Sequence, residues 1–286
     1  MRNQSPSGAT WTIFLTVFDQ APIGVLDSGI GGISVLNEMR QLLPYERFLY
    51  VADSGYMPYG PKPPEYIQGR CDLIARFLIS RGAKALVVVA CNTATAAAAE
   101  QMRARWSVPV LGMEPAVKPA AAATKRRVVG VLATSGMLVS ARFAALLDRF
   151  ADGIRVVTQP APELVLLVEA GNLDGKEAHA ACEAAVRPLL DAGADVIVHG
   201  CTHFPFLKPV IADIAGPDVV QIDTGAAVAR HLDSVLTSRD LLANGMNGGA
   251  QFFTSGDVAK AKAVVMRLYG RATVQALPDS FRQTAS

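Results

Sequence analysis

The 286-residue chain has few cysteines, a nearly balanced charge and no long hydrophobic segment. Its four cysteines form no CxxC pair, which argues against a disulfide scaffold and favours a reducing compartment, so we expect a cytoplasmic protein. No uninterrupted apolar run reaches the roughly 18 residues of a membrane span, and we expect no membrane association. Lys and Arg total 27 against 25 acidic residues and form no basic stripe, so no nucleic-acid partner is indicated.

The composition instead predicts a folded chain with a large core. Hydrophobic residues make up 51% and charged residues 18%, the reverse of the balance found in disordered proteins. At about 150 residues per domain, the length predicts two domains. Residues 1–20 include the short apolar stretch Trp11–Phe18 but no basic leader region or clean cleavage site. We interpret residues 1–20 as an extension outside the fold.

Short aliphatic runs alternate with amphipathic or alanine-rich stretches along the chain. Such runs, without polar alternation, predict parallel strands covered on both faces, and their alternation with helices predicts a doubly wound α/β fold. The predicted strands are Ile23–Leu26, Phe48–Ala52, Ala85–Ala90, Val108–Leu111, Val128–Leu132, Ile154–Thr158, Val196–His199 and Val219–Ile222. The predicted helices include Ile33–Leu43, Glu65–Arg81, Thr95–Trp106 and Lys176–Asp191.

A weak internal repeat divides this pattern into two similar halves. The segment GVLDSG at 24–29 resembles GVLATSG at 130–136, and VVVACNT at 87–93 resembles VIVHGCT at 196–202. Because both similarities occur in the same register, they predict two pseudo-symmetric α/β domains. We assign residues 21–113 plus 224–286 to the first domain and residues 114–223 to the second.

A glycine-rich segment, Asp27-Ser28-Gly29-Ile30-Gly31-Gly32, lies between the first strand and the first helix. Glycines here allow positive φ and free N–H groups to bind an anion. The spacing Gly29-x-Gly31-x-x-Ser34 nearly matches a dinucleotide motif, with Asp53 where a ribose-binding acid would lie. Ser34 replaces the third glycine, however, and Asp27 would repel a pyrophosphate. A tight turn without a ligand is therefore a better alternative than a dinucleotide site.

Two cysteines follow predicted strands, at the sheet edge where open α/β proteins place their sites. Cys91 is followed by Asn92 and Thr93, and Cys201 by Thr202 and His203. Helix-entry loops favour ionised thiols, and a histidine near a thiol can handle protons at neutral pH. Cys71 and Cys182 lie in helical patterns and fit buried packing positions instead. A zinc site from Cys91, Cys201 and His203 is an alternative, although it lacks the usual ligand spacing.

Two thiols at equivalent strand ends of two facing halves could invert the configuration of a carbon atom bound between them. One thiolate removes a proton from one face of an acidic carbon, while the other thiol delivers a proton to the opposite face. A serine hydrolase is a poorer alternative because no GxSxG elbow occurs and Ser28 has no adjacent base.

These motifs together resemble the cofactor-independent glutamate racemases, in order from about Ile23 to Gly270. The resemblance rests on VLDSGxGG at 25–32, AD at 52–53 with PYG at 58–60, ACNTA at 90–94, EPA at 114–116, VExG at 168–171, GCTHFP at 200–205 and TxGD at 254–257. It implies two α/β domains with the substrate between them. It also implies interconversion of L- and D-glutamate without cofactor or metal, which supplies D-glutamate for peptidoglycan.

The resemblance also implies a role for each site residue. Cys91 would be the base for D-glutamate and Cys201 the base for L-glutamate. Asp27 would assist Cys91, and His203, with Glu169 behind it, would assist Cys201. The implied substrate contacts are Asp27, Ser28, Tyr59, Gly60, Asn92, Thr93, Thr134, Thr202 and His203. Met137 departs from the family, in which many members have a second threonine, and this change would loosen a substrate hydrogen bond or be local variation.

Two alternatives stay open at this stage. Aspartate racemases, hydantoin racemases and maleate isomerases of the same superfamily share the paired-cysteine logic. A two-lobed amino-acid-binding protein without turnover would have the same architecture but no need for thiols at both strand ends. The glutamate enzyme is the preferred hypothesis, and we expect it to form a homodimer.

Overall fold

The computed structural model describes residues 21–88, 91–245 and 248–282, apart from the side chains of residues 87, 88 and 91. The predicted extension 1–20 and the last two residues of the strand predicted over Ala85–Ala90 lie outside the described residues.

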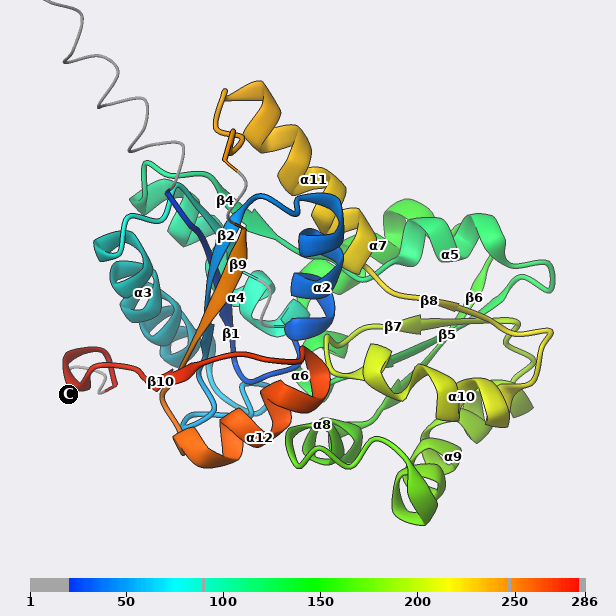
Figure 1. Cartoon of the computed structure of the whole chain (residues 1–286). Helices are drawn as coiled ribbons and strands as arrows, with labels where there is room; N and C mark the ends of the chain where they lie inside the picture. Colours follow the sequence, from blue (N-terminus) through cyan, green and yellow to red (C-terminus); the bar gives the residue numbers. More distant parts are fainter. Residues whose placement is uncertain (1–20, 89–90, 246–247, 283–286) are drawn as a thin grey trace, which may run out of the picture.

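Two parallel sheets form the centre of the fold (Figure 1). The six-stranded sheet has the order β10-β9-β2-β1-β3-β4 and the four-stranded sheet the order β6-β5-β7-β8. The first consists of β1 (Ile23–Asp27), β2 (Arg47–Ala52), β3 (Ala85–Val88), β4 (Val110–Gly112), β9 (Gly249–Thr254) and β10 (Val274–Ala276). The second consists of β5 (Val128–Ala133), β6 (Arg155–Pro160), β7 (Val196–His199) and β8 (Val220–Ile222). Two α/β domains with parallel sheets are therefore confirmed.

The two sheets repeat one strand order. In each, the first strand of the half lies between the second and the third, and the fourth lies beyond the third. The repeated segments 24–29 and 130–136 thus overlap the equivalent strands β1 and β5, and the two cysteines follow the equivalent strands β3 and β7. Because parallel strands end at a common edge, these segments lie at equivalent sheet edges.

Helices cover both faces of each sheet (Figure 1). Helix α2 packs on α11, α3 on α4, α5 on α7 and α9 on α10. One buried apolar cluster extends from α2 and α11 through α8 to α9, so a continuous core joins the two halves. The helices are α2 (Ile33–Leu42), α3 (Pro64–Ser80), α4 (Cys91–Arg105), α5 (Val117–Ala123), α6 (Ser135–Leu138), α7 (Ala141–Phe150), α8 (Pro162–Glu169), α9 (Gly175–Asp191), α10 (Lys208–Ala215), α11 (Gly225–Ser238) and α12 (Val258–Leu268), with 3₁₀ turns η1 (Phe204–Leu207) and η2 (Asp279–Phe281).

Two glycines end the long helices that precede the cysteine-bearing strand ends. Gly82 follows α3 with φ +85°, and Gly193 follows α9 with φ +92°. Both values lie in the left-handed region, where only glycine is unstrained, and such glycines commonly terminate helices. The chain then turns directly into β3 and β7, whose strand ends carry the site.

The structure corrects one local prediction. We expected a loop over Cys91–Thr93 before a helix at Thr95, but α4 begins at Cys91. Asn and Thr favour turns and caps over helix interiors, so the sequence pattern predicted Asn92 and Thr93 to lie before the helix. The first turn of a helix tolerates them, because its N–H groups have no intrahelical acceptor.

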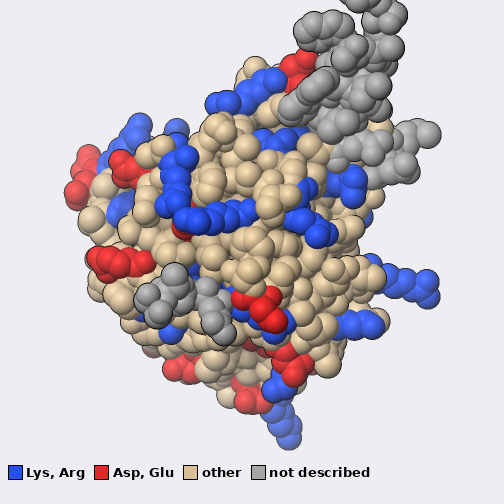
Figure 2. Space-filling model, turned by 90° about the vertical axis from the view of Figure 1, so that its left-hand side faces the viewer, with Lys and Arg blue, Asp and Glu red and all other residues tan. Residues whose placement is uncertain are grey.

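The surface carries charges of both signs. On the face that includes α3, basic and acidic side chains are interspersed (Figure 2), and Arg76 and Arg105 both pair with Asp72 there. No helix in the described part of the chain has the length and apolar composition needed to cross a membrane. The absence of a nucleic-acid partner stays a prediction.

Candidate active site

A cavity of about 310 Å³ lies where the carboxyl edges of the two sheets meet. Ser28, Thr134 and Cys201, which lie one or two residues beyond β1, β5 and β7, all line it. A concave site with a few polar groups among apolar walls is typical of small-molecule binding. Six predicted site residues line it: Ser28, Tyr59, Gly60, Thr134, Cys201 and His203. The other described residues that line it are Met57, Pro58, Pro61, Ser135, Pro162, Val165 and Leu166.

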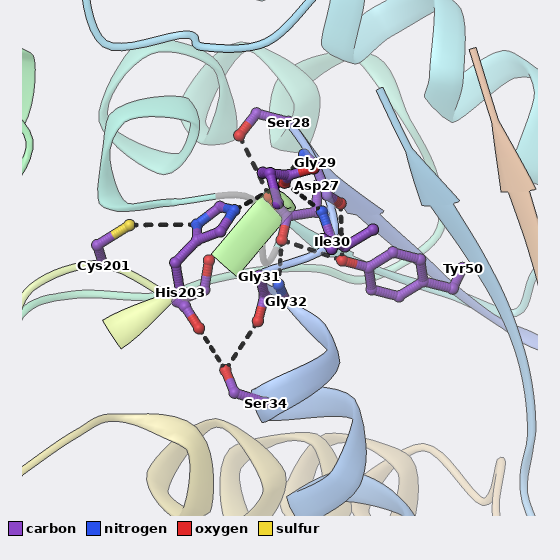
Figure 3. A network of polar contacts seen from close by, with 12 residues as sticks. Asp27, Ser28, Gly29, Ile30, Gly31, Gly32, Ser34, Tyr50, Cys201 and His203 are labelled. Atoms are coloured by element: carbon purple, nitrogen blue, oxygen red, sulfur yellow. Dashed lines mark hydrogen bonds and ion pairs between the residues drawn. The ribbon is translucent and has the colours of Figure 1, made fainter. Parts of the chain in front are cut away.

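Cys201, His203 and Glu169 form a hydrogen-bonded relay at this cavity. Figure 3 shows the Cys201 sulfur directed at the ring of His203. The Sγ atom of Cys201 lies 3.4 Å from Nδ1 of His203, and Nε2 of His203 lies 2.8 Å from Oε1 of Glu169. Both Cys201 and His203 are buried. The backbone turns between the two residues, which brings their side chains together. The relay provides a thiol with a proton-handling partner that a carboxylate orients.

The surroundings of His203 favour its charged form. Burial alone would lower the pKa of His203, but the adjacent Cys201 sulfur and Glu169 carboxylate raise that pKa well above its ordinary value. An imidazolium at this position stabilises a neighbouring thiolate electrostatically. The arrangement therefore suits a Cys201 side chain that acts as a base.

The glycine-rich loop after β1 binds carboxylates of the protein itself. The Ile30 N–H donates to Oε1 of Glu169 at 2.7 Å. A Cβ atom on Gly29 would lie 1.8 Å from Glu169 Oε1, and one on Gly31 would lie 2.4 Å from Nδ1 of His203. The glycines thus allow close approach of the relay from the other half of the molecule.

These contacts overturn the dinucleotide alternative. Asp53, the supposed ribose ligand, is fully buried and pairs with Arg70, with a distance of 2.6 Å between Oδ1 and Nη2. Its other oxygen, Oδ2, accepts a hydrogen bond of 2.6 Å from the Tyr59 hydroxyl. The Tyr59 hydroxyl therefore points away from the cavity that the residue lines.

Asp27, at the end of β1, is fully buried and held by the loop that follows it. Its Oδ1 accepts a hydrogen bond of 3.3 Å from the Gly29 N–H, and the Gly32 N–H donates to its Oδ2. The Tyr50 hydroxyl lies 3.0 Å from Asp27 Oδ2 and 2.9 Å from the Gly29 carbonyl oxygen. Burial raises the pKa of Asp27, against the opposing influence of His203. Tyr50 was not predicted, because a single tyrosine in a buried strand gives no local signal of this contact.

Polar side chains cross from one half to the other around the cavity. The Asn92 side-chain amide donates to the Gly200 carbonyl oxygen at 2.6 Å, and the hydroxyls of Thr93 and Thr134 lie 3.1 Å apart. The buried atoms of the described chain that have no hydrogen-bond partner include Asn92 Oδ1 and Thr202 Oγ1, both in the segments that carry the cysteines. Buried polar atoms of this kind are suited to bind a ligand's polar groups.

Ser34 links the two halves in a way the sequence did not reveal. Its hydroxyl lies 3.0 Å from the Gly31 carbonyl oxygen and 2.8 Å from that of Thr202. The residue that breaks the dinucleotide motif thus fixes the turn between Cys201 and His203 against α2.

Two further positions that the sequence analysis singled out are Cys91 and Met137. Cys91 begins α4 at the carboxyl end of β3, but its side chain lies outside the described residues, so its role stays a prediction. Met137 is buried in the second half, with its Cε atom near Gly200. It packs beneath the Cys201 turn and does not line the cavity. Among the described side chains, no three His, Cys, Asp or Glu groups are arranged to hold a metal ion.

Comparison with known proteins identifies the family. A family model described as Asp/Glu/Hydantoin racemase matches residues 23–232. A glutamate racemase from Ectopseudomonas mendocina is 56% identical over 252 residues, which are 88% of this chain and 95% of the relative. The chain belongs to the glutamate racemase family. It is accordingly an isomerase.

Solved structures of this family have the same fold. Glutamate racemase isoform RacE1 from Bacillus anthracis superposes with a TM-score of 0.81 at 31% identity, over 92% of this chain and 99% of that chain. Escherichia coli glutamate racemase, in complex with L-glutamate and the activator UDP-MurNAc-ala, gives a TM-score of 0.79 at 30% identity, over 90% and 98% of the two chains. The predicted family and fold are therefore confirmed.

Proposed function

We propose that this member of the family interconverts L- and D-glutamate by proton transfer between two thiols, Cys201 and Cys91. The observation that carries the proposal is the Cys201–His203–Glu169 relay, in which Cys201 lines the cavity. Cys91 follows β3, the strand equivalent to β7 before Cys201, and this equivalence supports Cys91 as the second thiol.

The chemistry balances without an external reactant. The Cys201 thiolate takes the α-proton of L-glutamate, and the electron pair stays on the α-carbon, delocalised into the α-carboxylate. The Cys91 thiol then delivers its proton to the opposite face. The products are D-glutamate, a Cys201 thiol and a Cys91 thiolate, and the reverse reaction exchanges the two roles. His203 and Glu169 stabilise the thiolate on the Cys201 side, and Asp27 assists Cys91.

The cavity offers the groups that a dicarboxylate amino acid requires. Ser28 and Thr134, which line the cavity, would bind the α-carboxylate, the ammonium and the side-chain carboxylate. Three residues adjacent to the lining would assist them: Thr93, whose hydroxyl lies 3.1 Å from that of Thr134, and Asn92 and Thr202, each with a buried polar atom that has no protein partner. Tyr59 and Gly60 would contribute through their backbone, since the Tyr59 hydroxyl is bound to Asp53. The thiols supply the acid and base, so the reaction requires neither cofactor nor metal.

The physiological setting follows from the same proposal. The enzyme would work in the cytoplasm, where thiols stay reduced, as a homodimer that supplies D-glutamate for peptidoglycan. Sedimentation velocity tests the dimer: a species of about twice the chain mass of 30.2 kDa is expected, and a monomer would contradict it.

A polarimetric assay tests the activity directly. The purified chain is incubated with L-glutamate, D-glutamate or either enantiomer of aspartate, with no cofactor added. We expect both glutamate enantiomers to reach a racemic mixture and aspartate to change little. Turnover of aspartate in preference to glutamate would assign the chain to another racemase, and binding of glutamate without any loss of rotation would indicate a binding protein.

A further inference from the structure

A fully buried ion pair lies behind the loop at residues 57–61, which lines one wall of the cavity. Arg70, on α3, and Asp53, after β2, are each 0% exposed. Arg70 Nε donates to Asp53 Oδ2 at 2.9 Å and Nη2 to Oδ1 at 2.6 Å, so the contact is bidentate. Buried ion pairs often add little net stability, because removing both charges from water offsets their attraction. This pair is therefore a candidate for a positioning role.

Tyr59 connects the ion pair to the cavity. Its hydroxyl donates to Asp53 Oδ2 at 2.6 Å, and its ring is buried among apolar side chains of α3 and β2. Burial and the nearby Asp53 carboxylate raise the pKa of Tyr59 well above its ordinary value, so the hydroxyl stays a donor. One oxygen of Asp53 thus accepts hydrogen bonds from both Arg70 and the cavity-lining residue.

The other side of Arg70 is bound to the C-terminal segment. Its Nη1 donates to the Arg282 carbonyl oxygen at 2.8 Å, and the Tyr56 hydroxyl donates to the same oxygen. The Tyr56 ring lies against the guanidinium, 3.7 Å from Cζ to the ring centroid. The cluster of Asp53, Arg70, Tyr59 and Tyr56 therefore fixes the 57–61 loop to both α3 and the chain end.

Small movements of this loop would change the cavity. Gly60 lies next to Thr134, on the opposite wall, with 3.5 Å between its Cβ position and the Thr134 Cβ atom. A Cβ atom on Gly136 would lie 2.4 Å from the Gly60 carbonyl oxygen. The loop thus contacts the second half directly, and its position sets the spacing of the two walls.

We propose that Asp53 and Arg70 are positioning residues, which hold the Tyr59–Gly60 backbone at the distance that glutamate binding requires. The inference rests on the proposed glutamate racemisation. Neither residue lines the cavity, so their influence falls on substrate affinity and on the choice between glutamate and the shorter aspartate, not on proton transfer.

Tyr59→Phe is the cleanest test, because it removes one hydrogen bond and keeps the buried ring. Loss of this hydrogen bond to a charged group should raise the KM for glutamate about tenfold and leave kcat within about twofold of the parent. Tyr45→Phe, at an exposed tyrosine outside the cavity, is the matched control and should leave both constants unchanged. The ratio of glutamate to aspartate turnover should fall in Tyr59→Phe and stay at the parent value in the control.

Asp53→Asn and Arg70→Lys test the pair itself, with circular dichroism to select variants that fold. In folded variants KM should rise as in Tyr59→Phe, and Tyr59→Phe should add little to Asp53→Asn because both changes break one contact. An unchanged KM in folded Tyr59→Phe, or an equal loss in kcat, would overturn the inference while leaving the racemisation intact. A parent chain inactive on glutamate would overturn both.

Discussion

A methyl group on Gly31 would lie 2.4 Å from the Nδ1 atom of His203. The loop after β1 and the histidine after β7 therefore pack atom against atom across the two halves. Nδ1 is also the atom that faces Cys201 Sγ, so the position of this loop determines the geometry of the relay.

Gly31→Ala should consequently impair racemisation. The added Cβ must displace the imidazole, and misplacement of a catalytic partner by about 1 Å can reduce rates by about 10²-fold. We expect kcat/KM to fall by about that factor, as a polarimetric assay would measure. Gly69→Ala is the matched control, since nothing beyond the adjacent backbone of α3 lies within 4 Å of that Cβ position. A Gly31→Ala enzyme as active as Gly69→Ala would contradict the observed packing.

His203→Asn should weaken the Cys201 side of the reaction more than the Cys91 side. Removal of the imidazolium leaves the Cys201 thiolate without its partner at 3.4 Å, which we expect to slow α-proton removal from L-glutamate by about 10²-fold. Because enantiomers have equal free energies, kcat/KM must remain equal in both directions, so the asymmetry has to be measured as α-proton exchange with D₂O. His179→Asn, exposed on α9, is the control. Equal losses for the two enantiomers would count against the assignment.

Much of this architecture was predictable because aliphatic runs mark buried parallel strands. The strands predicted at Ile23–Leu26 and Val196–His199 agree with β1 and β7 to within one residue. The contacts that complete the site were not predictable from local patterns. Glu169 lies 34 positions from His203 and 139 from Ile30, and only the family resemblance pointed to it.

The residues that hold the site residues in place were not predictable from local patterns either. Tyr50, Arg70 and Ser34 have ordinary local sequence patterns, and their roles depend on partners brought together by the fold. Conversely, Asp53 and the glycine loop suggested a nucleotide site because phosphate-binding loops and carboxylate-binding loops require the same N–H geometry. Ser34 and Asp27 already argued against a nucleotide in the sequence, and the contacts of Glu169 with the loop and of Asp53 with Arg70 show what the two features do instead.

Acid should destabilise the fold through His199. This histidine ends β7, and burial lowers its pKa from 6.5 to about 4, with a partial opposing influence from Gln221, whose Oε1 lies 2.9 Å from Nε2. The unfolded chain therefore takes up the proton first as pH falls. The contribution of neutral His199 is present above pH 6.5 and is lost between 6.5 and about 4, by about 3 kcal/mol.

Urea unfolding across this pH range measures the effect. His199→Gln keeps a donor for Gln221 but cannot take up a proton, so its stability should decline less steeply than that of the parent. His179→Gln should follow the parent. Parallel pH profiles for the parent and His199→Gln would show that another group causes the acid loss.

The pH dependence of turnover should be bell-shaped. One thiol must be ionised and the other protonated in the reactive enzyme, so kcat/KM falls on both sides of an optimum. The limbs report values for the pair of thiols, not for either residue. Initial-rate measurements from acid to alkaline pH should give this shape, whereas a rate that rises steadily to high pH would leave only one essential ionisation.

Exchange of the glutamate α-proton with D₂O, catalysed by Cys201→Ser and Cys91→Ser, tests the two-thiol mechanism most directly. Serine holds its proton far above the working pH, so each variant should lose net racemisation by at least about 10²-fold. In D₂O, Cys201→Ser should still exchange the α-proton of D-glutamate but hardly that of L-glutamate, and Cys91→Ser should do the reverse. If either variant folds normally and racemises glutamate within about tenfold of the parent, the two-thiol mechanism is wrong for this protein.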